Sequence, residues 1–166
     1  MMLSGCGVAK FYEETYTAEN YLIHNNGNDK VWLYVASTNT TKDMFPFYYS
    51  AKRLPPYSIY IRAHSSINQN NSISIAKVSI ELPDQKIIDP VLTNNIIIFS
   101  PPHEGAKYSE GSVSNSLSDS LPFYKGKEIK VCVSLLIGKD KIDTCKLYKG
   151  TKHVDTKSNF SVYMSV

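Results

Sequence analysis

Apolar and polar side chains alternate along much of this chain, and a period of two residues is typical of half-buried β-strands. In residues 57–63 the odd positions are apolar or aromatic, while Ser58, Tyr60 and Arg62 share the opposite face. The same alternation ends the chain, where Phe160 and the later even positions are apolar. Helical periodicity is nearly absent. The pattern therefore predicts an all-β protein whose last residues belong to the sheet.

Turn signals connect these strands. Two apolar runs, 21–23 and 31–35, flank an Asn-Gly pair at 26–27, which is a strong signal for a two-residue hairpin turn. Such a turn would place Leu22 opposite Val31. The second run is apolar on both faces, so we expect a central strand there.

Further runs complete the predicted fold. Residues 73–82 begin with one apolar phase and change to the other near Ile75, which predicts a β-bulge. Runs at 96–99 and 129–137 add two strands, and prolines fall between the runs or at their ends. Roughly eight to ten short strands without an internal repeat predict a single antiparallel β-sandwich over 16–166, with an immunoglobulin-like arrangement as one form. A sheet closed on itself is the alternative.

A second hairpin is expected at Gly138-Lys139, because Gly in the first position favours a two-residue type II′ turn. In that register Cys132 lies directly opposite Cys145 in a non-hydrogen-bonded pair, where facing Cα atoms are about 4.5–5.5 Å apart. That separation suits a disulfide, which persists in the periplasm and is rare in the cytosol. We therefore expect a Cys132–Cys145 bond, with two free buried thiols as the alternative.

Composition and motifs reduce the number of function classes that the sequence supports. The 166 residues carry a net charge of +3, and the basic residues are scattered, so we expect no nucleic-acid partner. Motifs for nucleophilic catalysis, phosphate binding and zinc binding are absent, and the four histidines are far apart in sequence. The sequence thus predicts a protein that is not an enzyme, with no catalytic residues, metal, cofactor or small-molecule substrate.

The remaining candidate chemistry lies on the surface. A long loop near 100–125 lacks strand periodicity, and such loops are usually functional or disordered. Its serine-rich centre favours disorder in the free protein, while its acidic residues suit a basic partner. One polar strand face is the other candidate patch. The candidate partner-binding residues are Tyr60, Arg62, His64, His103, Glu104, Glu110 and Asp119.

The N-terminus carries a further signal. Leu3-Ser4-Gly5-Cys6 resembles the bacterial lipobox, in which the chain is cut before the cysteine and the thiol is lipidated. In Gram-negative bacteria the Gly7 that follows implies sorting to the outer membrane. Residues 1–15 are then lipobox and tether, and Cys6 is the expected lipidation site. An unmodified cysteine near a frayed terminus is the alternative.

Export needs more than this motif. A signal peptide has a charged region and an apolar region of about 7–15 residues, whereas here only residues 1–3 stand before Ser4-Gly5-Cys6. We expect a form that starts at Met1 to remain cytoplasmic, and an exported form to lie on the periplasmic side of the outer membrane. No later segment approaches the roughly 18 apolar residues of a membrane span, so attachment is expected only through Cys6.

Together, Leu3-Ser4-Gly5-Cys6-Gly7 and the Lys130-Val131-Cys132-Val133 hairpin strand resemble the periplasmic immunity lipoproteins of Gram-negative type VI secretion systems. The resemblance implies a non-catalytic toxin inhibitor that binds an antibacterial effector one to one and occludes its active site. A phospholipase is the effector class that it implies.

Two other classes remain open. A structural outer-membrane lipoprotein of a secretion or envelope assembly machine would have the same motifs. A lipidated enzyme or carbohydrate-binding module is supported only by the number of aromatic residues, which include 12 tyrosines.

Overall fold

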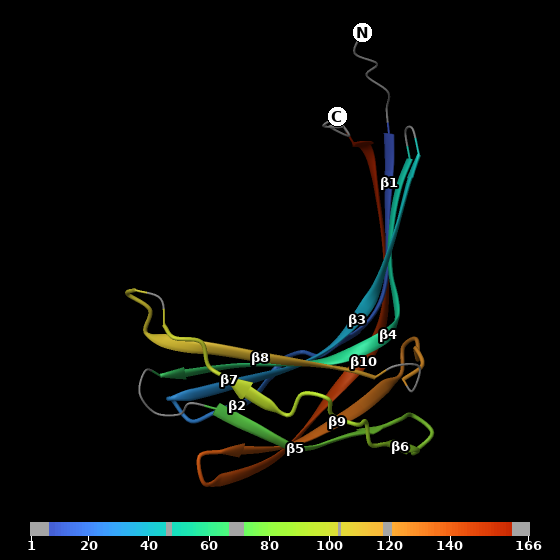
Figure 1. Ribbon diagram of the computed structural model, residues 1–166. Coiled ribbons are helices and arrows are strands. Elements are labelled where there is room, and N and C mark those ends of the chain that lie inside the picture. Colours follow the sequence, from blue (N-terminus) through green and yellow to red (C-terminus); the bar gives the residue numbers. More distant parts are fainter. Residues whose placement is uncertain (1–6, 46–47, 67–71, 103, 118–120, 161–166) are drawn as a thin grey trace.

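The computed structural model describes residues 7–45, 48–66, 72–102, 104–117 and 121–160 (Figure 1). These residues form ten strands and no helix, which confirms the all-β prediction, and none of them lies in a helix that could cross a membrane. The strands are β1 (Gly7–Thr17), β2 (Leu22–Asn25), β3 (Asp29–Phe45), β4 (Tyr48–Ser66), β5 (Ser72–Glu81), β6 (Ile87–Ile88), β7 (Ile96–Ile98), β8 (Tyr108–Ser116), β9 (Glu128–Ile137) and β10 (Asp140–Phe160).

All ten strands belong to one open sheet. Its order is β2-β3-β4-β1-β10-β9-β5-β6, with β7 paired to β5 and β8 paired to β4. Every pairing is antiparallel except β1–β4, which is parallel. The expectation of a purely antiparallel sheet is therefore wrong at this pair. Because β1 lies between two strands of opposite direction, it must be parallel to one of them.

The core lies where this sheet folds back on itself as two layers, which we call the body (Figure 1). One layer contains β2, β8 and the adjoining halves of β3 and β4, and the other contains β5, β9 and the first half of β10. The first layer contributes Val31, Leu33, Val35, Ile59, Ile61, Ala63 and Val113 to one buried cluster. The second contributes Ile73, Ile75, Val78, Ile80, Val131, Val133, Leu135, Ile137 and Tyr148. Alternation thus places aliphatic side chains inside from both layers, as in a sandwich.

The two layers join through a four-stranded extension, which we call the arm, formed by residues 39–45, 48–53, 7–13 and 152–160 (Figure 1). It contains the ends of three strands that are longer than expected, with 17 residues in β3, 19 in β4 and 21 in β10. Residues 7–15, expected to be a tether, instead belong to β1. Backbone pairing on both sides, to β4 and β10, holds this polar segment in the sheet.

At the bend between arm and body, β4 contains Pro55 and Pro56, which are joined by a cis peptide bond. Neither proline has an N–H, and the backbone pairing of β3 with β4 is interrupted there, between Ser37 and Asn39. Side chains of β3 bridge the two strands at this point by donating to carbonyl groups of β4. Thr38 Oγ1 donates to the Pro56 carbonyl at 3.0 Å, Asn39 Nδ2 donates to the Pro55 carbonyl at 3.4 Å, and Ser37 Oγ donates to the Leu54 carbonyl.

Two local predictions are confirmed. The pairing of β5 with β9 shifts register between Ile75 and Lys77, which is the predicted bulge. In the β9–β10 hairpin Ile137 pairs with Asp140, and Cys132 pairs with Cys145. These two cysteines form a disulfide with Cα atoms 4.0 Å apart.

The predicted register of the β2–β3 hairpin is wrong. Leu22 pairs with Trp32 rather than with Val31, and a register irregularity follows Leu22. Asn26 explains the longer turn, because its Oδ1 accepts hydrogen bonds from the N–H groups of Asn28 at 3.0 Å and Asp29 at 2.6 Å. Asparagine side chains commonly replace backbone acceptors in this way.

The stretch expected to be a loop near 100–125 contains strand β8. Val113 and Asn115 point inward, and the serines at the intervening positions are exposed. Buried Asn115 is satisfied by Asn94, since its Oδ1 accepts from the Asn94 N–H at 2.9 Å and its Nδ2 donates to the Asn94 carbonyl at 2.7 Å. Because the outer face of β8 is polar and one inward residue is an asparagine, its sequence lacks the alternation of apolar and polar residues that predicts a strand. The final segment 161–166 lies outside the described residues.

Candidate functional site

The outer surface of the β3–β4–β8 layer is the candidate functional site. Aliphatic side chains occupy the inward positions of these strands, so alternation leaves the aromatic and charged residues outside. We call this surface the aromatic face. Its residues are Trp32, Tyr34, Tyr60, Arg62, His64, Tyr108 and Glu110.

An ion-pair cluster joins β4 to β8 on this face. The Arg62 Nη2 lies 2.7 Å from the Glu110 Oε2, and the His64 Nε2 lies 3.4 Å from the Glu110 Oε1. The hydrogen bond to Glu110 raises the pKa of Arg62, so the guanidinium stays charged. Because the Arg62 and Glu110 side chains are 42% and 45% exposed, the pair adds little stability and remains open to a partner.

His64 lies between two aromatic rings. Tyr108 stacks on it with ring centres 4.4 Å apart and an angle of 7°, and Trp32 meets it edge-on at 4.6 Å. Burial lowers the pKa of His64, and Glu110 acts in the opposite direction. The ring is therefore mainly neutral at neutral pH and forms part of a packed aromatic surface.

A second row of rings extends this surface toward β2. Tyr21 stacks on Tyr34 with ring centres 4.8 Å apart, and Tyr34 lies 5.9 Å from Tyr60 in a tilted arrangement. Such pairs fix the side chains in position, so that a partner would meet a preformed surface.

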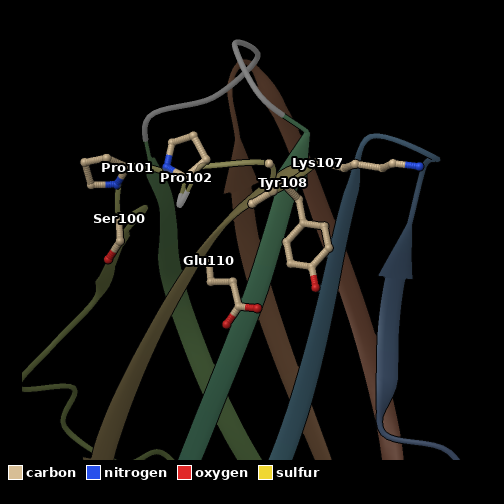
Figure 2. A pocket seen from close by; sticks show the side chains of 8 residues that line it. Ser100, Pro101, Pro102, Lys107, Tyr108 and Glu110 are labelled. Carbon is tan, nitrogen blue, oxygen red and sulfur yellow. The ribbon is translucent and has the colours of Figure 1, made fainter.

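Two hollows border the aromatic face. The first, of about 610 Å³, lies beneath the segment that precedes β8, and Figure 2 shows Tyr108 and Glu110 beside it while Lys107 extends away. It is lined by Ser100, Pro101, Pro102, Gly105, Ala106, Lys107, Tyr108 and Glu110. The second, of about 470 Å³, shares Ser100 and Glu110 with the first and reaches Tyr60 and Arg62. The hollows thus continue the aromatic face as a concave surface.

The structure brings together four of the seven predicted partner-binding residues, namely Tyr60, Arg62, His64 and Glu110. Glu104 is exposed in a turn before β8. His103 and Asp119 lie outside the described residues, as does the predicted lipidation site Cys6.

The sequence did not identify three residues of this face. Trp32 and Tyr34 belong to a run that is apolar at every position, and this pattern predicts a central strand rather than an exposed face. In this run aromatic residues alternate with aliphatic ones. This alternation indicates which face is partly exposed, because aromatic side chains with polar atoms tolerate partial exposure. Tyr108 lies in the segment interpreted as a loop.

Within the described ranges, no group of three or more His, Cys, Asp or Glu side chains is arranged to hold a metal ion. The groups that the aromatic face presents are stacked rings, the exposed guanidinium of Arg62, and the Glu110 carboxylate, which lies beside both Arg62 and the mainly neutral His64 ring. These groups could contact another molecule through ring stacking, hydrogen bonds and ion pairs.

No protein-family model, curated protein or solved structure matches this chain.

Proposed function

We propose that this chain is a non-catalytic immunity protein that binds an antibacterial type VI secretion effector in the periplasm and occludes its active site. The aromatic face is the binding surface in this proposal, and the effector is a phospholipase bound one to one.

The composition of the aromatic face is the observation that carries the proposal. Trp, Tyr and Arg are enriched among the residues that dominate protein–protein binding energy, and this face presents all three around Arg62. The tyrosine rings are held by each other before binding. A protein that must capture a toxin quickly benefits from such a preformed surface, because little side-chain freedom is lost on association.

The disulfide supports the proposed compartment. Cys132 and Cys145 are bonded on the outer surface of the second layer, and such bonds persist where thiols are oxidised. The lipobox-like sequence at Cys6 adds an anchor on the outer membrane to the proposal.

The direct test combines this protein with the toxin encoded beside its gene. We expect co-expression to rescue cells from the toxin and the two proteins to co-purify one to one. Arg62→Ala and Tyr60→Ala should each weaken binding by about 1 kcal/mol or more, because both residues lie at the centre of the face.

The matched control is Lys130→Ala. Lys130 is also exposed and paired with a carboxylate, Glu81, but it lies on the other layer. We expect this variant to bind the toxin as the unsubstituted protein does. Absence of both rescue and co-purification would refute the immunity proposal, and equal losses from Lys130→Ala and Arg62→Ala would refute the assignment of the face.

A structural outer-membrane lipoprotein is the second candidate, and the arm favours it. Along the arm, the outer edges of β3 and β10 pair with no described strand, and open edges serve assembly by strand addition. Neighbouring genes for envelope-machine subunits in place of a toxin would favour this candidate.

A further inference from the structure

The outer edge of β10 in the arm has free backbone groups. On one side residues 151–156 pair with β1, and on the other side no described strand pairs with them. In the body the same side of β10 pairs with β9 as far as Glu128, the first residue of β9, so the open edge begins beyond this pairing (Figure 1). An edge strand of this kind is a template for another strand.

Hydrogen bonds at Gly150 show which residues face outward. The Gly150 N–H donates to the Lys127 carbonyl at 2.9 Å, and the Gly150 carbonyl accepts from the Gly126 N–H at 2.8 Å, both on the side away from β1. Backbone groups alternate sides along a strand. The N–H and C=O groups of Lys152, Val154 and Thr156 therefore point to the open edge.

The side chains on this edge are self-complementary. In an antiparallel pair related by a two-fold axis at Val154, Val154 meets its own copy and His153 meets Asp155. Val154 is 48% exposed, and His153 is exposed. Lysine side chains often protect edge strands from pairing with another strand. The Lys152 ammonium group instead lies over the Tyr12 ring, with Nζ 4.5 Å from the ring centre. The edge thus offers two His–Asp contacts on one face of the sheet and a Val154–Val154 contact on the other.

We propose that β10 binds a second copy of this chain along its outer edge, in antiparallel register centred on Val154. The two arms then form one continuous sheet across a two-fold axis, and the two bodies lie at opposite ends. Val154 forms the central pair through its own N–H and C=O groups. The 124–127 segment occupies the edge at Gly150 and limits the new ladder to the residues beyond it.

The other open edge of the arm lacks this complementarity. Antiparallel self-pairing of β3 about Asp43 would bring two carboxylates together, and self-pairing about Lys42 would bring two ammonium groups together. Like charges directly opposite destabilise a pair. A two-fold axis at Thr41 avoids these contacts, but it pairs Lys42 with Thr40 and so brings no opposite charges together. The second copy is therefore assigned to β10, where His153 meets Asp155.

Cross-linking tests the register. In the full chain carrying Cys6→Ser, Val154→Cys would place two thiols opposite each other, with Cα atoms about 5.5 Å apart, which is within disulfide range. We expect mild oxidation to convert most of this variant into a covalent dimer. Thr41→Cys, on the exposed edge of β3, is the matched control and should remain monomeric.

Sedimentation of the same chain without the added cysteine tests association itself. We expect the mass to rise from 18.7 kDa to twice that value with increasing concentration. Asp155→Lys should abolish the increase, because it replaces the carboxylate opposite His153 with an ammonium group, and His153→Glu combined with Asp155→Lys should restore it by making a Glu–Lys pair. Recovery by the double variant separates loss of pairing from misfolding. A monomer at every concentration, or equal cross-linking at Thr41 and Val154, would overturn the proposal.

Discussion

The hydroxyl of Tyr148 in β10 donates a 2.6 Å hydrogen bond to the main-chain carbonyl of Leu33 in β3, across the interior between the two layers. Both side chains are fully buried. The Leu33 N–H donates to the Tyr21 carbonyl at 2.9 Å, and the Leu33 carbonyl accepts the hydrogen bond from Tyr148. A polar bond thus fixes how the two layers lie against each other.

Tyr148→Phe should lower the free energy of unfolding by about 1–3 kcal/mol, because it leaves the buried Leu33 carbonyl without that donor. Urea unfolding measures the change. The control is Tyr60→Phe, the same chemical change on the aromatic face, which should cost less. Equal stability of Tyr148→Phe and the unsubstituted protein would contradict the importance of this bond.

Alkaline pH should destabilise the fold. Burial raises the pKa of Tyr16 from 10.0 to about 12, and burial also raises the pKa of Tyr57 and Tyr148. The folded state holds these protons more tightly than the unfolded chain does. Stability is therefore complete below pH 10 and falls as the pH rises from about 10 to about 12. Urea unfolding across this range checks the expectation, and Tyr16→Phe should reduce the pH dependence.

Gly150→Ala should destabilise the protein by about 2 kcal/mol or more, because a Cβ there would overlap the main-chain carbonyl of Tyr124. The 124–127 segment would have to leave β10, with loss of both hydrogen bonds at Gly150. Thermal unfolding measures the effect. Ser112→Ala, an exposed change on β8, serves as the control, and similar melting temperatures for the two variants would contradict the close approach.

Replacing both Cys132 and Cys145 by Ser should lower the free energy of unfolding by about 3 kcal/mol, since the bond closes a short loop that is otherwise flexible in the unfolded chain. Urea unfolding of the double variant measures this, and Cys6→Ser alone should have no effect. Mass spectrometry without reductant should find the two peptides linked. Two alkylatable thiols at these positions would contradict the bond.

Local patterns predicted those parts of the fold that depend on neighbouring residues. The β9–β10 register followed from one two-residue turn, and the bulge near Ile75 followed from a change of apolar phase. The β2–β3 register failed because the Asn26 side chain bonds to the backbone and lengthens the turn. Strand β1 was missed because its apolar and polar residues do not alternate, and its partner β10 is distant in sequence.

The candidate site, like the fold, could be predicted only where it depends on residues that are neighbours in sequence. Tyr60, Arg62 and His64 lie on one strand, so their common face follows from a period of two. Their contact with Glu110 depends on the pairing of β4 with β8, which no local pattern indicates. Trp32 joins the site because β3 is a neighbour of β4 and its second face is uncovered.

The arm also gives the protein a direction-dependent mechanical response. Gly7 and Phe160 face each other at the arm's outer end. Force that separates these two positions would open the β1–β10 ladder like a zipper, one hydrogen bond after another, at low load. Force between Gly7 and the aromatic face would instead act along β1, where the bonds to β4 and β10 share the load. A molecule held at its N-terminal end and pulled through its aromatic face is thus loaded in its stronger direction.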